Sequence, residues 1–559
     1  LTQIRKVLRK IKMLIKRMKG VVVAATSFFH CLHLLIRESE AACLDWCEDE
    51  HVPWFNATGV QKCEFVDCDS CIPCLQMRST ALEADFTHEP PMNDFLAKSP
   101  WPMTHRNSYA QASSPYRGPE KNEVRRTTFS SSALRNTGVG LITICFSSPY
   151  PDGDTAVWAS TGSYIIKATT SLNYIDKRPK NNTISETEKE NLLSGAYTLV
   201  DNDNIFYVPE VTLIRAYGDQ EENVLTSPID LKRTFNVPAE HLSGADEIIV
   251  GMTITYDGLL AFVTSRGLVG VVSRDFNASY FYSLTGGDSE EVSNSISCDE
   301  NGGIYVVSST NMYRIQWTGR ELSSFEEDGG WVAKYDNECG LFDGVALGAG
   351  SGSTPSLMGT DVDDDKFVVI TDCQDVMNLV LFWRDEIPDD WETLPGTVDR
   401  RIAGQVPVQF GDTGTDSSFS EQSVLVRGYG ALVVNNELQK EDLLFEPAIA
   451  SGLDSVSPKG VEKFEWNPST RLLERAWANK KVSIPNGIPT MSQKSNLIYG
   501  VSHGRGFWTF IGLDWTTGKR IFEKRYGTGT IFNSAYAGTE IGPFGQLYTG
   551  ILNGMARMQ

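Results

Sequence analysis

The chain has 559 residues, of which 41% are apolar and 10% aromatic, so it can bury one large hydrophobic core or several smaller ones. Charged residues make up 22% of it and the mean hydropathy is -0.23, which excludes a disordered acidic chain and a bundle of membrane helices. The net charge of -21 argues against a body that binds nucleic acid.

Residues 1–41 have the features of a secretory signal. Nine basic and two acidic residues lie in this segment, and its basic run is followed by the apolar stretch Gly20–Ile36 and the small-residue site Ser39–Ala41. The same segment also fits an uncleaved signal-anchor or a basic amphipathic helix on a membrane surface. We expect a cleaved signal and a secreted, extracellular or lumenal protein, with a membrane-anchored protein as the alternative.

Residues 42–75 form a cysteine-rich segment. An even set of six cysteines at this density, behind a signal-like segment, predicts a small module closed by three disulfides. The spacing Cys68-x-x-Cys71-x-x-Cys74 also fits zinc ligands, but export disfavours the reduced thiolates that zinc requires. The six residues are Cys43, Cys47, Cys63, Cys68, Cys71 and Cys74.

Other residues agree with export. Three Asn-x-Ser/Thr triplets, beginning at Asn56, Asn181 and Asn277, are acceptors for glycosylation. Four further cysteines lie in the body of the chain, where they either pack in the core or pair in two bridges: Cys145, Cys298, Cys339 and Cys373.

Residues 76–136 lack sustained periodicity and are rich in Pro, Ser, Asn and Arg, so we interpret them as a linker or wrapping segment. From residue 137 to residue 559 the texture changes to short β-branched and aromatic runs separated by Gly, Asp and Asn. One apolar run recurs eight times, and the clearest copies follow a glycine turn. The predicted core strands span residues 156–160, 205–210, 260–264, 304–308, 367–371, 431–435, 497–501 and 547–551.

These repeats predict an all-β fold, a seven- or eight-bladed β-propeller preceded by a small disulfide-rich module. A lone four-stranded sheet cannot bury both faces, and its edge strands would pair with other chains. A closed ring of sheets gives each one two neighbours. Because the last unit stops at Gln559 soon after its second strand, we expect an early segment within 99–145 to complete it. Two separate β-sandwiches are the alternative.

Two stretches carry a family resemblance. Residues 99–107 (SPWPMTHRN), with 113–119 (SSPYRGP) after them, resemble the lead-in of secreted pyrroloquinoline-quinone-like propellers. Residues 512–522 (GLDWTTGKRIF) are similar to that family's strand–turn–strand repeat, with Phe522 where the family has tryptophan. The resemblance implies a quinoprotein-like propeller over residues 99–559.

The cofactors that the resemblance implies are pyrroloquinoline quinone and calcium. Quinone-dependent dehydrogenases of this kind often have two adjacent cysteines beside the cofactor, and the chain has no Cys-Cys pair. Many proteins with the repeat bind no quinone. Calcium is therefore the favoured cofactor and the quinone the disfavoured one.

Polar residues follow every core strand and should converge at one rim of the ring. Glu210, Asp372 and Asn436 could supply oxygen ligands to calcium in a lactonase or esterase. His503 or Arg505 would then act as the acid–base or oxyanion group. Polar turn formers after strands are common, however, so the same residues also fit ordinary turns. The other rim positions are Ser160, Arg266, Ser309 and Asn553.

A second candidate cation site lies in the acidic loop before residue 367. Carboxylates at Asp361, Asp363 and Asp365 could converge on calcium. The loop lacks the glycine and glutamate of a helix–loop–helix calcium site and equally fits a solvated acidic turn.

Two functions follow from these observations. The first is a secreted or lumenal binding or scaffold module, whose partner is a protein or a small molecule. The second is an enzyme with its site at the channel mouth, either a calcium-dependent lactonase or esterase or a quinone-dependent oxidoreductase. No nucleic-acid partner is expected, and a membrane would be met only through an uncleaved N-terminal segment.

Overall fold

The computed structural model divides into two compact units, Leu1–Thr80 and Ala81–Gln559. All residues that it describes belong to the second unit: 83–124, 127–130, 142–180, 195–284, 290–339, 349–360, 362–438, 450–552 and 554–559. None of the helices in these ranges has the length and apolar character needed to cross a bilayer. Several sequence predictions lie outside the described residues, namely the signal, the six-cysteine module, Asn56, Asn181, Asp361 and Asn553.

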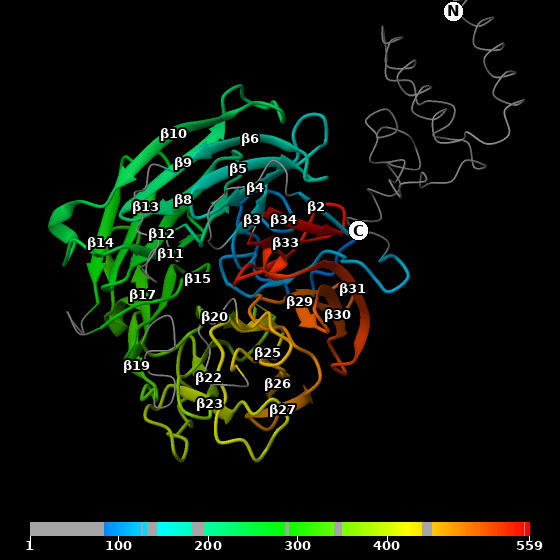
Figure 1. Ribbon diagram of the computed structural model, residues 1–559. Coiled ribbons are helices and arrows are strands. Elements are labelled where there is room, and N and C mark those ends of the chain that lie inside the picture. Colours follow the sequence, from blue (N-terminus) through cyan, green and yellow to red (C-terminus); the bar gives the residue numbers. More distant parts are fainter. Residues whose placement is uncertain are drawn as a thin grey trace, which may run out of the picture. The chain divides into compact units, whose positions relative to one another are not determined.

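The second unit is an eight-bladed β-propeller, which confirms the predicted fold class (Figure 1). Its described residues form eight sheets of four or five strands, each a meander that we number as blades 1 to 8 in chain order. The alternative of two β-sandwiches is wrong, because each repeat unit forms its own sheet.

In blades 1 to 7 the chain runs from the inner strands of the blade outward, whereas the outermost strand of blade 8 comes from an earlier part of the chain. Blades 1 to 4 contain β3 (Thr143–Phe146), β4 (Ala156–Ser160), β5 (Tyr164–Thr169), β6 (Tyr174–Pro179), β7 (Leu199–Val200), β8 (Phe206–Glu210), β9 (Leu213–Asp219), β10 (Ile229–Asn236), β11 (Ile249–Ile254), β12 (Leu259–Thr264), β13 (Leu268–Ser273), β14 (Ser279–Ser283), β15 (Ser297–Cys298), β16 (Gly303–Val307), β17 (Asn311–Trp317), β18 (Leu322–Ser323) and β19 (Trp331–Lys334). Blades 5 to 8 contain β20 (Ser356–Met358), β21 (Phe367–Thr371), β22 (Asn378–Trp383), β23 (Ile402–Pro407), β24 (Leu425–Arg427), β25 (Gly430–Val434), β26 (Val461–Asn467), β27 (Leu472–Asn479), β28 (Thr490–Ser492), β29 (Leu497–Gly504), β30 (Phe507–Asp514), β31 (Arg520–Thr528), β32 (Thr539–Ile541), β33 (Leu547–Ile551) and β34 (Gly554–Met558). In the described ranges, three short 3-10 helices lie between them at Ala239–His241, Glu326–Asp328 and Thr530–Phe532.

Burial falls from the middle strands of each blade outward. The second strands, such as β4, β21 and β33, are buried at every position because neighbouring blades cover both faces. The outer strands β6 and β31 are instead mostly exposed or half-buried and carry charged side chains. Charged outer edges prevent the sheets from pairing with other chains.

The ring closes between its first and last blades. Early in the chain, β2 (Thr127–Ser130) pairs antiparallel with β34 and is the outermost strand of blade 8. This strand lies within the segment 99–145 that we expected to complete the last unit. The Phe146 ring of blade 1 packs edge-on against Tyr548 of blade 8, with ring centroids 5.0 Å apart. Strand pairing and side-chain packing therefore both join the first blade region of the chain to the last blade.

The body cysteines follow neither simple expectation in full. Cys339 and Cys373 form a disulfide across 34 residues of sequence. Cys145 and Cys298 are free thiols, both fully buried in the core. One bridge and two core residues thus replace the two alternatives that the sequence left open.

Candidate functional site in the propeller axis

The innermost strands of a propeller are edge strands, whose unpaired backbone groups face the axis. Such groups are costly to bury without partners. In this protein an N-terminal segment, residues 93–115, satisfies them, and we call it the axial strap. From Ser99 to Pro115 every residue is buried except the half-buried Thr104. Part of the segment interpreted as a linker or wrapping segment therefore lines the inside of the ring.

The axial strap meets the blades in chain order through backbone hydrogen bonds. Its carbonyl groups accept N–H donors from the innermost strands of six blades, and it contacts β11 of blade 3 through the side chains of Asn93 and Ser108. The strap ends in β1 (Ser113–Ser114), which pairs parallel with β28. The backbone donors and acceptors are Phe146 N to Trp101 O (2.9 Å), Val200 N to Pro102 O (2.8 Å), Cys298 N to Ser108 O (2.7 Å), Leu357 N to Tyr109 O (2.9 Å), Val426 N to Gln111 O (3.0 Å) and Met491 N to Ala112 O (3.0 Å).

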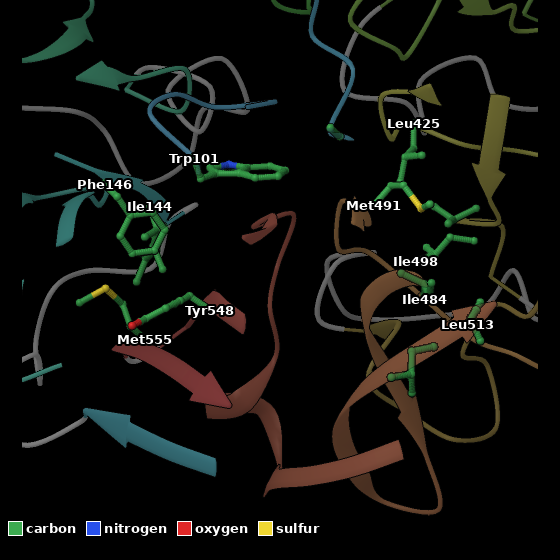
Figure 2. Close-up of a cluster of buried hydrophobic side chains, with 14 of the residues drawn as sticks. Trp101, Ile144, Phe146, Leu425, Ile484, Met491, Ile498, Leu513, Tyr548 and Met555 are labelled. Carbon is green, nitrogen blue, oxygen red and sulfur yellow. The ribbon is translucent and has the colours of Figure 1, made fainter. Parts of the chain in front are cut away.

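Side chains of the strap also pack into the ring's core. Trp101 is buried in the same cluster as Ile144 and Phe146 of blade 1, and Figure 2 shows its ring beside them. Arg106, on the strap, forms a largely buried ion pair with Glu89. The strap is thus anchored by backbone bonds, apolar packing and a charge pair.

Described residues of the axial strap and the ring enclose a cavity. Its volume is about 60 Å³, room for roughly four to six water-sized groups. Residues from the strap and from blades 1 and 8 line it, together with residues just before the innermost strands of blades 2, 4, 6 and 7. They are Trp101, Thr104, His105, Thr143, Ile144, Ala196, Tyr197, Asn294, Glu421, Gln422, Ser423, Ile488, Tyr536, Gly538 and Glu540.

Glu540 is the most unusual residue of this axial cavity. It lies in the middle of β32, the innermost strand of blade 8, and only 3% of it is exposed. Its Oε2 atom has no hydrogen-bond partner in the protein. Burial raises the pKa of this carboxyl well above its usual value, opposed only by a hydrogen bond from its own backbone. Burial therefore favours the protonated form of Glu540 over the carboxylate.

His105 crosses from the axial strap to the neighbouring blades. Its Nε2 lies 3.3 Å from Thr354 Oγ1 and 3.4 Å from Ser423 Oγ. Its Nδ1 has no partner, and burial lowers the pKa of the ring to about 4. The His105 backbone has a φ of 63°, a left-handed conformation that non-glycine residues rarely adopt.

The third unpartnered group is Gln422, whose Nε2 is buried without an acceptor. Its neighbour Glu421 accepts a hydrogen bond from the Tyr536 hydroxyl at 3.0 Å. The loop is held by Asn436, whose Oδ1 accepts the backbone N–H of Glu421 at 2.9 Å and whose Nδ2 donates to Pro485 O at 2.9 Å. Asn436, predicted as a metal ligand, thus positions cavity residues.

The other two predicted rim ligands are bound within their own blades. Glu210 accepts a hydrogen bond from the Tyr217 hydroxyl at 2.7 Å and pairs with Arg215 at 3.2 Å. Asp372 accepts two hydrogen bonds from Asn378, and burial raises its pKa to about 7. Neither residue lines the axial cavity.

His503 and Arg505 also lie away from the axial cavity. His503 is the seventh residue of β29, its ring centroid is 4.6 Å from that of Trp508, and its Nδ1 is 3.4 Å from Asp454 Oδ1. Burial lowers the pKa of His503, against the opposing charge of Asp454. Arg505 is exposed at the tip of the hairpin between β29 and β30, with a φ of 54°.

Two of the three carboxylates predicted as ligands in the acidic loop are described, and each has protein donors. Asp363 Oδ2 accepts the backbone N–H of Thr360 at 2.7 Å, and Asp365 Oδ2 accepts from Trp466 Nε1 at 2.8 Å, joining blade 5 to blade 6. Within the described ranges no three His, Cys, Asp or Glu residues are grouped as a metal site would require. Asn277 is exposed in the turn before β14.

Sequence reasoning examined the residues after the core strands and therefore missed the axial cavity. Glu540 belongs to a strand of only three residues, Thr539–Ile541, which is too short to show periodicity. Only the structure shows that this carboxyl lies between two buried residues, Thr539 and Ile541. His105 lies in the stretch 99–107 that carries the family resemblance, but no pattern in the sequence connects it to the ring.

The chain is 45% identical over 487 residues to an uncharacterized protein of Archaeoglobus fulgidus, covering 85% of this chain and 90% of that one. It belongs to the family of that archaeal protein. No family model matches the chain.

Solved structures agree on the fold. The quinohemoprotein alcohol dehydrogenase of Comamonas testosteroni is similar with a TM-score of 0.51 and 11% identity, over 86% of this chain and 84% of that one. The resemblance to quinoprotein-like propellers is thus confirmed as one of fold. The Dos1 propeller reaches a TM-score of 0.40 at 10% identity, over 78% of this chain and 93% of that one, too low to support an argument.

The axial cavity does not fit a quinone of three fused rings. Pockets that enclose drug-sized ligands measure about 300–1,000 Å³, whereas this one measures about 60 Å³. The strap carbonyls that fill the axis are bonded to the blades and cannot be displaced without breaking those bonds. The site suits a much smaller molecule.

Proposed function

We propose that this propeller is an exported binding module that holds a small polar molecule in the axial cavity. The observation that supports it is the set of three buried side-chain atoms without protein partners, Glu540 Oε2, Gln422 Nε2 and His105 Nδ1, on residues that line one cavity. Buried polar atoms without partners are costly, so a bound molecule that satisfied them would stabilise the fold.

Export is supported by the signal-like residues 1–41 and by the disulfide Cys339–Cys373, because disulfides persist in oxidising compartments. Mass spectrometry of the mature protein tests this part of the proposal. A first residue near Ala41 or Ala42 is expected, whereas a retained Gly20–Ile36 segment would favour the membrane-anchored alternative.

The second function, a calcium-dependent lactonase or esterase or a quinone-dependent oxidoreductase, is less favoured. It relies on Glu210, Asp372 and His503, which lie in three different blades and interact with residues of their own surroundings. Turnover of lactones, or of alcohols with added quinone and calcium, by the purified protein would reverse this preference.

The binding proposal is tested by native mass spectrometry and thermal unfolding of the purified full chain against a panel of small polar molecules. We expect at least one to bind with one-to-one stoichiometry and to raise the unfolding temperature. Gln422→Ala should reduce the shift, because it removes an unpartnered donor. Equal shifts in the wild type and in Gln422→Ala would contradict binding in the axial cavity.

A further inference from the structure

The lining of the axial cavity is one-sided in charge. It contains two carboxyl side chains, Glu421 and Glu540, and the lining residues in the described part of the chain include neither lysine nor arginine. His105, the remaining titratable ring with a charged form, is held neutral by burial. Any charge that enters this cavity must therefore be positive to be stabilised.

Aromatic side chains complete the lining. Trp101, Tyr197 and Tyr536 all contribute to it, from the strap, from the segment before β7 and from the segment before β32. Aromatic faces attract cations within about 6 Å of the ring centroid, most strongly when water is excluded. Carboxyl groups beside several aromatic rings are the combination that recognises organic ammonium ions.

We propose that the axial cavity binds a small organic ammonium ion of a few non-hydrogen atoms, with Glu540 as its counter-ion. This inference rests on the proposed function, since it names the ligand class of the same cavity. The volume of about 60 Å³ sets the upper size, near that of methylammonium or 2-hydroxyethylammonium. Gln422 and His105 offer partners for a hydroxyl group on the ligand.

Binding of a cation changes the protonation of Glu540. Without a charged partner, burial favours the uncharged form of the Glu540 carboxyl. On binding, the carboxyl releases its proton to solvent and the resulting carboxylate pairs with the ammonium group, so one proton leaves as one cation enters. Affinity should therefore rise with pH, because proton release accompanies binding.

The alternatives predict different ligands. An anion would meet two carboxyl groups and no basic side chain. A metal ion would need several converging oxygen ligands. Within the described ranges, no group of three His, Cys, Asp or Glu residues could hold one. Water alone would fill the space without selectivity.

Titration calorimetry with the full chain tests the inference, using 2-hydroxyethylammonium, the neutral propan-1-ol and the anion glycolate at pH 6, 7 and 8. We expect the ammonium ion alone to bind, and to bind more tightly at pH 8 than at pH 6. Glu540→Gln should weaken binding at least 100-fold while raising the unfolding temperature, which shows that the variant folds. Glu474→Gln, an exposed carboxyl on β27, removes the same charge elsewhere and should bind as the wild type does.

The outcomes separate the two levels of the account. Binding of propan-1-ol or glycolate that is lost in Gln422→Ala would overturn the ammonium inference and leave the binding proposal standing. Ammonium binding unchanged in Glu540→Gln, or calcium or sodium alone giving the same heat, would also overturn the inference. Failure of all three probes at every pH would overturn both.

Discussion

Asn436 Oδ1 accepts the backbone N–H of Glu421 at 2.9 Å. Asn436 follows β25, the second strand of blade 6, and Glu421 precedes β24, the innermost strand of the same blade. The hydrogen bond therefore joins the rim of the ring to its axis. Through Asn436 Nδ2 and Pro485 O the same side chain also reaches the segment before blade 7. A rim residue thus sets the position of cavity residues without touching the cavity.

Asn436→Ala should therefore weaken ligand binding and lower the free energy of unfolding by about 1–2 kcal/mol, the cost of the lost hydrogen bonds. Calorimetry and chemical denaturation measure the two effects. Asn435→Ala is the matched control, because its side chain bonds to Lys459 O, away from the cavity. Equal effects of the two substitutions would contradict the positioning role.

Trp101→Ala tests the contribution of the axial strap to stability. The side chain is 3% exposed in the core cluster that joins blade 1 to blade 7, and the loss of so large a buried side chain should cost about 3–5 kcal/mol. Met92→Ala, at a position 73% exposed just before the strap, should change the unfolding free energy by less than about 0.5 kcal/mol. A small effect of Trp101→Ala would mean that the strap does not pack as described.

Reduction of the disulfide Cys339–Cys373 should destabilise blades 4 and 5, which it joins. For a loop closed over 34 residues, the chain-entropy model gives about 3–4 kcal/mol. Thermal unfolding with and without reductant measures this loss of stability. In the double variant Cys339→Ser/Cys373→Ser, reductant should no longer lower the unfolding temperature of the propeller. Alkylation of Cys339 in unreduced, folded protein would contradict the bridge.

His105 predicts an acid-sensitive propeller. Its pKa is about 4 in the fold and 6.5 in the unfolded chain, so between these pH values only the unfolded chain binds the proton. Stability is complete above pH 6.5 and falls as the pH drops toward 4, by about 3 kcal/mol in all. Denaturation curves across this range should show a shallower slope for His105→Gln than for the wild type; parallel slopes would refute the assignment.

The titration of Asp372 changes the stability with pH in the opposite direction. Its pKa is raised from 3.8 to about 7, so the native state holds the proton that the unfolded chain releases, and stability is lost as the pH rises through this window. Asp372→Asn removes the titration and keeps an acceptor for the backbone N–H of Asn378. The variant should be more stable than the wild type at pH 8, by up to about 4 kcal/mol, and equally stable near pH 4. If the stability difference between Asp372→Asn and the wild type were the same at pH 4 and pH 8, the raised pKa of Asp372 would be contradicted.

The core strands could be predicted from the sequence because each is buried on both faces. Residues 367–371 and 547–551 are continuous apolar runs, and the structure places β21 and β33 on these same residues. Glycine turns before them were equally visible, and Gly258 has the positive φ of 88° that such a turn requires. A doubly buried strand leaves an uninterrupted apolar signature.

The axial strap could not be predicted, because it bonds through carbonyl groups that every residue has. No side-chain pattern reports that the Ser108 and Tyr109 carbonyls accept N–H donors from two adjacent blades. The axial cavity was missed for the same reason. Its residues come from the strap, from the short innermost strands β3 and β32, and from the segments before other innermost strands, none of which carries a periodic signal.

The most direct test of the account is hydrogen–deuterium exchange of the peptide spanning residues 100–115. With the strap inside the ring, the bonded N–H groups of Thr104 and Ala112 should exchange as slowly as those of the second strands, over hours. Exchange of this peptide within seconds, while residues 367–371 stay protected, would show that the axis is open and would contradict both the strap and the cavity that it encloses.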